Sequence, residues 1–203
     1  MIRRKISAGN LILGAVLLAA ALAMALEVNK PAPDFTLTDH QGKTHSLSQY
    51  KGKYVVLEWI NFDCPFVRKH YGSGNMQALQ KEYTKKGVVW LSVCSSAPGK
   101  QGHFDAKEIT KRLAEAGGAQ TAYLIDAEGK VGRLYGAKTT PHMFIIDPEG
   151  KLIYNGAIDS IRSTDKDDIK KAENYVRTVL DAVLNGKEVK PFTTVPYGCS
   201  VKY

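Results

Sequence analysis

The sequence predicts a single α/β domain in which helices cover both faces of a mixed β-sheet. Two observations carry this prediction. Strand-like and helix-like segments alternate through the first half of the chain, and the second half contains a hairpin followed by a helix. The 203 residues are 44% hydrophobic and 24% charged, a globular composition that excludes disordered, collagen-like and polytopic membrane proteins.

The first half contains a strand, a loop and a helix in close succession. Residues 34–38 alternate like an edge strand, and residues 39–43 form a predicted turn. Residues 54–60 form a nearly continuous apolar run, which is typical of a central strand that is buried on both faces. After a short loop, Pro65 suits the first turn of a helix, which is expected to break at residues 72–74.

The remaining elements follow the same order of strand and helix. The interrupted helix resumes and ends near residues 85–87, where cations and a glycine favour a C-terminus. Residues 88–93 are predicted to form a second buried strand and residues 105–116 a helix. Strands over 143–146 and 152–154 flank a tight turn and form a hairpin.

A long final helix is predicted from about Asp167 to Asn185. Its apolar residues recur with helical spacing on one face, and they are Ile169, Ala172, Val176, Val179, Leu180 and Val183. Asn185 and the glycine after it favour the end of the helix at this point.

Residues 1–25 have the features of a signal peptide. The basic residues near its start are Arg3, Arg4 and Lys5. An apolar run over 11–22 and a small-x-small pattern at 23–25 follow, and the segment contains no acid. We therefore expect an exported protein, periplasmic or secreted, with a mature domain over 26–203. The alternative is an uncleaved leader, which would then be the protein's contact with a membrane.

The chain has a net charge of +8 and an isoelectric point near 9.3. Its lysines are scattered along the sequence, and aromatic residues do not alternate with them in a basic patch. This pattern favours a solvated surface and no nucleic-acid partner.

Cys64 lies where a buried strand is predicted to give way to a helix. The N–H groups of the helix's first turn and the helix dipole both favour the thiolate. Arg68, four residues later on the same face, would add a cation, whereas Asp63 would act in the opposite direction. We interpret Cys64 as a reactive thiol with a lowered pKa. The alternative is a buried structural cysteine, the more common fate of an isolated one.

Three segments resemble the thioredoxin-like superfamily and, within it, the peroxiredoxin-like redoxin branch of AhpC/TSA type. They are residues 32–35 (APDF), 64–67 (CPFV) and 197–203 (YGCSVKY), and the likeness extends over 28–203. The resemblance implies a thioredoxin-like fold and a thiol-dependent oxidoreductase that requires no metal, flavin or nucleotide.

The resemblance also implies roles for the residues around Cys64. Peroxiredoxins carry Thr-x-x-Cys-Pro, so their peroxidatic cysteine maps to Cys64, while Asn61 stands in place of the threonine. The amide of Asn61 and the helix N-terminus would then hold the substrate oxygen, and Arg68 would favour the thiolate. Leu57 replaces the proline that begins the peroxiredoxin signature. These departures weaken the case for a peroxide substrate more than the case for a reactive thiol.

Thr140-Pro141 resembles the cis-proline loop that faces the active cysteine in thioredoxin-like proteins. We expect a cis bond between these two residues, since cis X-Pro bonds occur mainly in tight turns. The backbone beside them would pair with a substrate chain or with a partner thiol protein.

Cys199 is the candidate resolving thiol. Val67 stands where a Cys-x-x-Cys motif starting at Cys64 would place its second sulfur, whereas Cys199 lies in a C-terminal tail able to fold back over the active loop. Cys94 ends an apolar strand and is expected to be buried and inert. A Cys64–Cys199 disulfide is therefore our hypothesis. The alternatives are a structural Cys199 or one paired between chains.

The sequence thus predicts an exported thiol-based oxidoreductase that reduces a peroxide or a protein disulfide and is regenerated by an external dithiol reductase. Two alternatives remain: protein thiol–disulfide exchange without peroxidase activity, and a non-catalytic thioredoxin-like binding module. A soft metal site is disfavoured because the chain lacks a short-spaced cysteine pair, although three histidines could join the cysteines: His70, His103 and His142.

Overall fold

The computed structural model describes residues 26–203, so the expected signal peptide over 1–25 lies outside the described residues. The strands are Thr36–Asp39 (β1), Thr44–Ser46 (β2), Val55–Trp59 (β3), Val89–Cys94 (β4), Ala122–Ile125 (β5), Thr139–Thr140 (β6), His142–Ile146 (β7), Leu152–Gly156 (β8), Phe192–Thr193 (β9) and Cys199–Ser200 (β10). The α-helices are Pro65–Gly72 (α1), Asn75–Lys85 (α2), Ala106–Ala116 (α3), Lys130–Leu134 (α4) and Tyr175–Leu184 (α5), and short 3-10 helices cover Leu47–Tyr50 (η1) and Lys166–Lys170 (η2).

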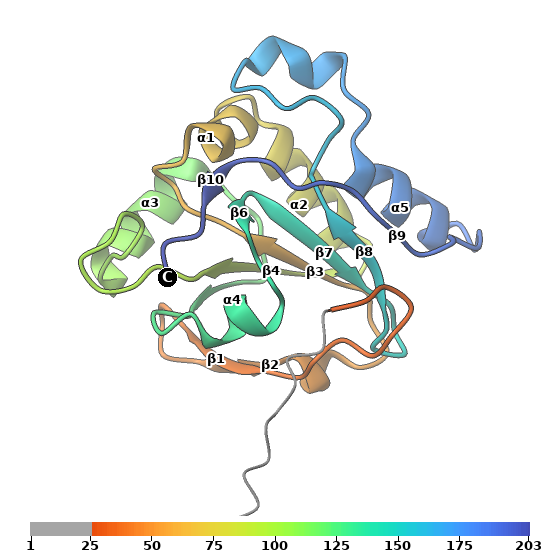
Figure 1. Ribbon diagram of the computed structural model, residues 1–203, viewed down its shortest axis with the longest axis horizontal. Helices are drawn as coiled ribbons and strands as arrows, with labels where there is room; N and C mark the ends of the chain where they lie inside the picture. Colours follow the sequence, from red (N-terminus) through yellow and green to blue (C-terminus); the bar gives the residue numbers. More distant parts are fainter. Residues whose placement is uncertain (1–25) are drawn as a thin grey trace, which may run out of the picture.

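Eight strands form one mixed sheet in the order β2-β1-β5-β4-β3-β7-β8-β9, and β10 pairs with β6 in a separate two-stranded sheet (Figure 1). At the centre, β3 runs parallel to β4 and antiparallel to β7. All residues of β3 and β4 are buried, as predicted for strands covered on both faces. The prediction of an edge strand over 34–38 is wrong, because β2 pairs with β1 and takes the edge position itself.

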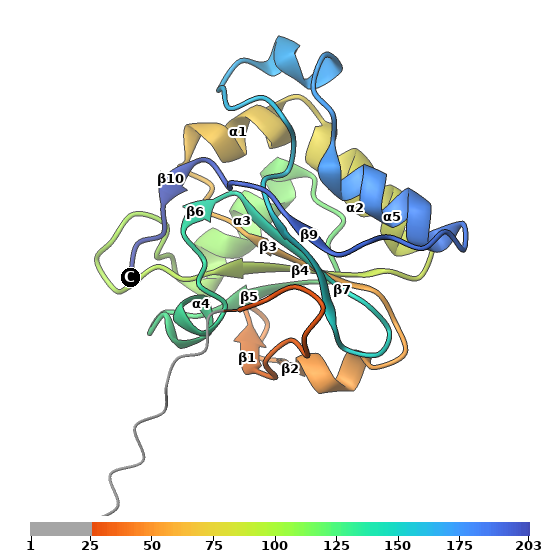
Figure 2. The same ribbon diagram turned by 45° about the vertical axis from the view of Figure 1, so that its right-hand side comes forward.

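Helices cover both faces of the sheet, which confirms the predicted fold class (Figure 2). On one face, α2 and α5 pack against the even-numbered side chains of β3, such as Val56, and α1 and α3 contribute Val67 and Ile109 to the adjoining cluster. On the other face, α4 and η1 pack against the odd-numbered side chains, such as Leu57. The period of two along β3 therefore assigns its side chains to two separate cores.

The prediction of a long final helix is wrong for the first half of that segment. Residues from about 167 form the short helix η2, and α5 begins only after Asn174, so Ile169 and Ala172 lie outside the α-helix. The Asn174 side chain accepts a hydrogen bond from the backbone N–H of Arg177 and caps α5. This capping bond gives the helix a defined start, which the apolar spacing alone did not reveal.

The antiparallel pairing of β3 with β7 decides where the functional loops meet. Trp59 lies opposite His142, so the loop that follows β3 and the Thr140-Pro141 segment that precedes β7 lie at the same end of these two central strands. Within residues 26–203, none of the helices is long and apolar enough to cross a membrane.

Candidate active site

Cys64 is the N-cap residue of α1, at the carboxyl end of the central strand β3. The backbone N–H of Cys64 donates to the carbonyl oxygen of Asn61 at 3.0 Å and closes the turn between strand and helix. Pro65 follows as the first helical residue, where its missing N–H has no intrahelical partner to lose. The predicted sequence of strand, loop and helix is confirmed here.

Two further segments meet at this helix start. The Thr140-Pro141 peptide bond is cis, as predicted, and it precedes β7 beside the loop that carries Cys64. From the C-terminal tail, β10 pairs antiparallel with β6, which sets Cys199 opposite Thr140 (Figure 1). The backbone edge at which the sequence predicted an external chain is thus occupied by the protein's own tail.

Cys64 is completely buried, and its thiol donates a hydrogen bond to the carbonyl oxygen of Thr140 at 2.9 Å. Burial acts to raise the pKa of this thiol, because it removes water from the thiolate. Hydrogen bonding by the side chains of Cys199 and Thr140 and by backbone N–H groups outweighs burial, so the pKa is lowered. The sulfur forms no capping hydrogen bond of standard geometry, yet the N–H of Val67 still stabilises its anion.

The pKa of Cys199 moves in the opposite direction. Burial and the neighbouring Cys64 sulfur raise it to about 11. All three cysteines are free thiols in this structure. The two pKa shifts make Cys64 the thiol of this pair that ionises more readily and Cys199 the one that keeps its proton.

Cys94 is buried, as expected. Its sulfur lies 3.4 Å from the hydroxyl of Ser96 and 3.4 Å from the carbonyl oxygen of Gly102. Burial raises the pKa of this thiol, in contrast to that of Cys64. The environment of Cys94 is therefore that of an unreactive cysteine.

Thr140 provides a hydroxyl that the sequence analysis did not single out. Its Oγ1 is buried and forms no hydrogen bond of standard geometry within the part of the chain that the structure describes. The same side chain helps to lower the pKa of Cys64, which places the hydroxyl next to the sulfur. Buried polar groups are normally hydrogen-bonded, so a hydroxyl in this position is suited to bind a thiolate or a substrate oxygen.

Asn61 shapes the loop before Cys64. Its side-chain oxygen accepts a hydrogen bond from the N–H of Asp63 at 2.9 Å, and its amide nitrogen donates to the carbonyl oxygen of Gln101 at 3.1 Å. The amide thus joins the active loop to the loop that follows β4. Its predicted contact with a substrate oxygen stays a prediction.

Arg68 lies on the surface, with its side chain 66% exposed. Its guanidinium donates to the carbonyl oxygen of Phe62 at 3.1 Å and pairs with Asp63 at 3.2 Å. Arg112 from α3 binds the same carboxylate at 2.8 Å. The largest influences on the pKa of Cys64 come from other groups, so the predicted effect of Arg68 on the thiolate stays a prediction.

A buried carboxyl group, Glu58 in β3, lies among four donors. These are Trp90 Nε1 at 2.8 Å, Tyr71 Oη at 3.0 Å, and Ser92 Oγ and Gln80 Nε2, both at 3.1 Å. Burial raises the pKa of Glu58 even though these donors favour its anion. The network ties α1 and α2 to the sheet beneath the active loop.

Tyrosines anchor the tail on both sides of Cys199. Tyr197 donates a hydrogen bond to Asp159, and Tyr203 donates to the carbonyl oxygen of Ala137 at 2.8 Å. Sequence reasoning missed both contacts. Local pattern gave no signal for them, since each partner lies at least 38 residues away along the chain.

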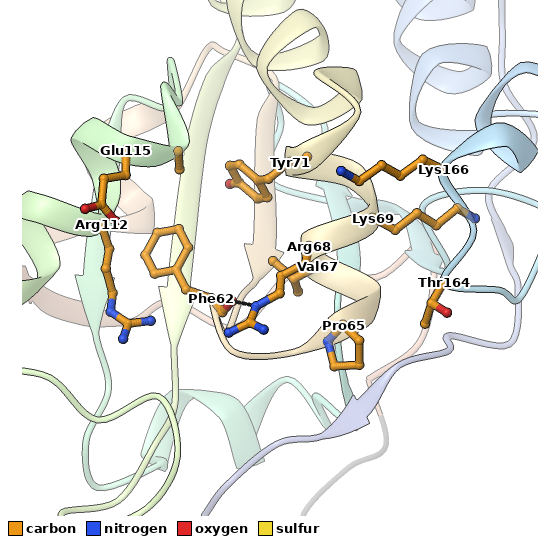
Figure 3. Close-up of a pocket in the computed structure, with 12 residues that line it drawn as sticks. Phe62, Pro65, Val67, Arg68, Lys69, Tyr71, Arg112, Glu115, Thr164 and Lys166 are labelled. Atoms are coloured by element: carbon orange, nitrogen blue, oxygen red, sulfur yellow. Dashed lines mark hydrogen bonds between the residues drawn. The ribbon is translucent and has the colours of Figure 1, made fainter.

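A surface cavity of about 490 Å³ runs along the outer side of α1 (Figure 3). Phe62 and Pro65, the neighbours of Cys64, line it, whereas the sulfur itself is buried. Arg112 borders the cavity from α3 and Lys166 from η2, with α1 between them. Cationic side chains predominate along this rim.

Residues 28–155 match the AhpC/TSA family, which is well over half of the chain. The chain belongs to this family. The matched segment includes Cys64, Thr140 and Pro141, whereas the tail with Tyr197 and Cys199 lies beyond it.

Curated relatives of this family member include two kinds of thiol enzyme. The thiol-disulfide oxidoreductase ResA of Geobacillus thermodenitrificans is 33% identical over 129 residues, which cover 63% of this chain and 68% of ResA. The selenocysteine-containing peroxiredoxin PrxU of Peptoclostridium acidaminophilum is 34% identical over 134 residues, covering 62% of this chain and 64% of PrxU. The AhpC/TSA protein described here is therefore a thiol-based oxidoreductase of the redoxin type.

Solved structures share its fold. An uncharacterized conserved protein from Geobacillus kaustophilus is 28% identical, with a TM-score of 0.74 and coverage of 88% of this chain and 93% of that one. A putative thiol:disulfide interchange protein DsbE from Chlorobium tepidum is 27% identical, with a TM-score of 0.55 and coverage of 72% and 94%. The thioredoxin-like architecture predicted from the sequence is thereby confirmed.

Proposed function

We propose that this redoxin reduces a peroxide or a disulfide through the Cys64 thiolate, and that Cys199 is its resolving thiol. The observation that carries the proposal is that β10 pairs with β6 and sets Cys199 opposite Thr140, whose carbonyl oxygen accepts the hydrogen bond of the Cys64 thiol. The pKa of Cys64 is lowered, and that of Cys199 is raised to about 11. A nucleophilic thiolate beside a protonated thiol is the arrangement that a two-cysteine cycle requires.

With a peroxide, the thiolate sulfur attacks the terminal oxygen and the O–O bond breaks. Cys64 becomes a sulfenic acid, and the peroxide leaves as an alcohol or water after taking up a proton. The Cys199 sulfur then attacks the Cys64 sulfur, an S–S bond forms, and the hydroxyl group and the Cys199 proton leave as water. An external dithiol, the proposed partner, reduces the disulfide by two thiol–disulfide exchange steps.

Residues around the sulfur have distinct roles in this proposal. The Thr140 hydroxyl and the N-terminus of α1 bind the substrate oxygen and the thiolate. Asn61 holds the active loop in place through its bonds to Asp63 and Gln101, and its amide is the proposed contact of the substrate oxygen. Arg68 and the cationic rim along α1 favour anions near the active loop. The cycle requires no cofactor or metal.

Disulfide exchange without peroxide chemistry is the second candidate, favoured by the ResA relatives and by the replacement of the family's threonine by Asn61. In that case a partner's disulfide is the electrophile that the Cys64 thiolate attacks. The first partner sulfur leaves as a thiol, and Cys64 is joined to the second in a mixed disulfide. The Cys199 sulfur then attacks the Cys64 sulfur, the Cys64–Cys199 bond forms, the bond to the partner breaks, and the partner leaves as a dithiol.

One titration tests both candidates. The reduced mature protein is treated with hydrogen peroxide or with a small disulfide, and non-reduced peptides are analysed by mass spectrometry. We expect a Cys64–Cys199 link with either oxidant, faster with peroxide if peroxidase chemistry dominates. The Cys94→Ser variant is the control and should form the same link. Linkage of Cys64 to Cys94, or no reaction with either oxidant, would contradict the proposal.

We also propose that the protein acts outside the cytoplasm, on the basis of the leader-like sequence of residues 1–25. Expression of the full chain in a bacterial host, followed by fractionation and intact-mass measurement, tests this. A periplasmic or secreted product that begins at Leu26 is expected. A full-length product confined to the cytoplasm would contradict it.

A further inference from the structure

The pairing that brings Cys199 to Cys64 is very short. Only two residue pairs form the β10–β6 ladder, Cys199 with Thr140 and Ser200 with Thr139. Side chains alternate between the two faces of a strand, so a slip of one residue would turn Cys199 away from Cys64. A ladder of two pairs is too short to set its own register, which therefore depends on contacts outside it. On the C-terminal side of Cys199, the backbone N–H of Val201 donates to the carbonyl oxygen of Lys138 at 3.2 Å, and that of Ala97 donates to the carbonyl oxygen of Lys202 at 2.9 Å. On the N-terminal side, side-chain contacts must hold the segment.

Tyr197, two residues before Cys199, makes such contacts. Its side chain is buried, and its ring packs edge-on against Phe66 of α1 with the centroids 5.8 Å apart. Its hydroxyl donates to Asp159, which lies in the segment after β8. Gly198, between Tyr197 and Cys199, runs so close to Thr140 that a Cβ atom would lie 2.1 Å from the Thr140 carbonyl oxygen.

The partners of Tyr197 are themselves held in a directed chain of hydrogen bonds. The Asn75 amide donates to Nδ1 of His70 at 2.9 Å, so the proton of the neutral ring is on Nε2, which faces the Tyr197 oxygen at 3.3 Å. Burial lowers the pKa of His70 to about 4 and keeps the ring neutral. Lys69 Nζ lies 3.4 Å from the other oxygen of Asp159.

These buried hydrogen bonds contribute little net free energy to the stability of the fold. Lys69 and Asp159 are almost fully buried, and the loss of hydration offsets much of the attraction within such a pair. The best-attested benefit of buried polar groups is the choice of one register over another. Lys69 and His70 belong to α1, which also begins at Cys64, so one helix positions both the nucleophile and the tail.

We propose that Tyr197, held by Asp159 and His70, is a positioning residue that sets the register of the C-terminal tail so that Cys199 faces Cys64. This inference rests on the proposed function, because the step it serves is disulfide closure. In that step Cys64–SOH and Cys199–SH form an S–S bond and release one water molecule. With the Tyr197 hydroxyl removed, the end of the tail stays attached through Tyr203 and the backbone bonds of Val201 and Lys202, but the segment before them samples arrangements in which Cys199 is out of reach.

The experiment uses the Tyr197→Phe variant of the mature protein, which keeps the ring and loses only the hydroxyl. After a pulse of hydrogen peroxide, the Cys64 sulfenic acid is trapped with a dione reagent and the disulfide is quantified by mass spectrometry over time. The pH profile of Cys64 alkylation gives the thiolate fraction. We expect sulfenate formation per thiolate to stay within about twofold of wild type and closure to slow at least about tenfold, since small misplacements of reacting groups have effects of this size.

Tyr83→Phe is the matched control. Tyr83 is a buried tyrosine of α2 that donates to the carboxylate of Asp181 at 2.8 Å, away from the tail. This variant loses the same kind of hydrogen bond and should close its disulfide at the wild-type rate.

The outcomes distinguish this inference from the proposed function. If wild type never links Cys64 to Cys199, the proposed function is wrong and the inference falls with it. If wild type closes and Tyr197→Phe closes equally fast, only the positioning role is overturned. Equal slowing in Tyr83→Phe also overturns it, since the effect would then be a general loss of stability.

Discussion

At the scale of single residues, the chemistry depends on how the surroundings of three similar thiols differ. Cys94 and Cys64 are both buried, yet the pKa of Cys94 is raised and that of Cys64 is lowered. At Cys64 a thiol, a hydroxyl and two backbone N–H groups outweigh the effect of burial, whereas at Cys94 the hydroxyls of Ser96 and Tyr123 do not. Reactivity therefore depends on the balance between burial and the hydrogen bonds available to the anion.

Thr140→Val tests the contribution of the hydroxyl. The change removes a donor to the Cys64 sulfur, so the pKa of Cys64 rises and the thiolate fraction at neutral pH falls. We expect alkylation at pH 7 to slow by roughly tenfold, the equivalent of one charge-assisted hydrogen bond. Thr140→Ser keeps the hydroxyl and should retain the wild-type profile. An unchanged profile in the valine variant would show that the hydroxyl does not act on the sulfur.

At the scale of elements, short segments with few hydrogen bonds of their own build the active site. The two residues of β6 and the two of β10 are held by what surrounds them: the cis peptide bond, the sheet next to it and the tyrosines of the tail. Such segments open more easily than the central strands. The cover over Cys64 is therefore expected to open more easily than the central sheet.

Gly198→Ala tests that cover. Gly198 has a φ of 144°, a conformation that favours glycine, and an added Cβ would collide with the Thr140 carbonyl oxygen at 2.1 Å. We expect the tail to detach and a bulky maleimide to label Cys64 at least about tenfold faster, since strain of about 1–3 kcal/mol is introduced.

Gly42→Ala is the control for Gly198→Ala. Gly42 also has a positive φ, 85°, but an added Cβ there meets nothing within 4 Å. This variant carries conformational strain without a collision at the tail, so labelling of Cys64 should match wild type. Equal labelling in the two variants would mean that the tail does not shield the sulfur.

Asn174→Ala tests the unexpected start of α5. The alanine cannot accept the hydrogen bond from the backbone N–H of Arg177. We expect the free energy of unfolding to fall by about 1 kcal/mol and the melting temperature by about 2–4 °C, measured by thermal denaturation. Asn174→Asp keeps an acceptor oxygen and should lose little. An alanine variant as stable as wild type would mean that the cap is unimportant.

At the scale of the whole molecule, the fold keeps several ionisable groups neutral in its interior. His142 accepts a hydrogen bond from the N–H of Lys138 at 3.2 Å and donates to the side-chain oxygen of Asn155 at 2.8 Å. Burial lowers its pKa to about 4, as it does for His70. Both rings are next to segments of the active site. Protonation of these histidines is therefore expected to destabilise the fold and to disturb the site at the same time.

This linkage predicts a dependence of stability on pH. The pKa of His142 is about 4 in the folded protein and about 6.5 when unfolded, so the unfolded state binds the proton more readily between these values. The contribution of His142 to the free energy of unfolding is fully present above about pH 6.5. It is lost as the pH drops toward 4, by about 3 kcal/mol for a single group of this kind.

His142→Gln removes this titration. Chemical denaturation at several pH values should show a flatter stability profile between about pH 6.5 and 4 than in wild type. The matched control is His103→Gln at an exposed histidine, which should keep the wild-type slope. A slope unchanged in the His142 variant would contradict the assignment.

Much of the architecture was predictable because it depends on local pattern. The apolar runs of β3 and β4 and Pro65 after Cys64 predicted the central sheet and the helix that begins at the thiol. The break in the final helix was missed, because the apolar spacing of Ile169 and Ala172 continues through a segment whose structure is decided by the capping side chain of Asn174. The pattern of apolar residues predicts which face of a helix is buried, whereas the capping residues decide where the helix begins and ends.

The sequence by itself determined that a cysteine lies at the N-terminus of a helix, directly after a buried strand, because the strand, proline and helix signals are all local. Only the tertiary structure decided which groups surround that cysteine. Thr140 lies 76 residues from Cys64 along the chain, and the Tyr197–Asp159 bond spans 38 residues. Hydrophobic periodicity says which side of an element is buried, but which polar groups meet there depends on how several elements pack together.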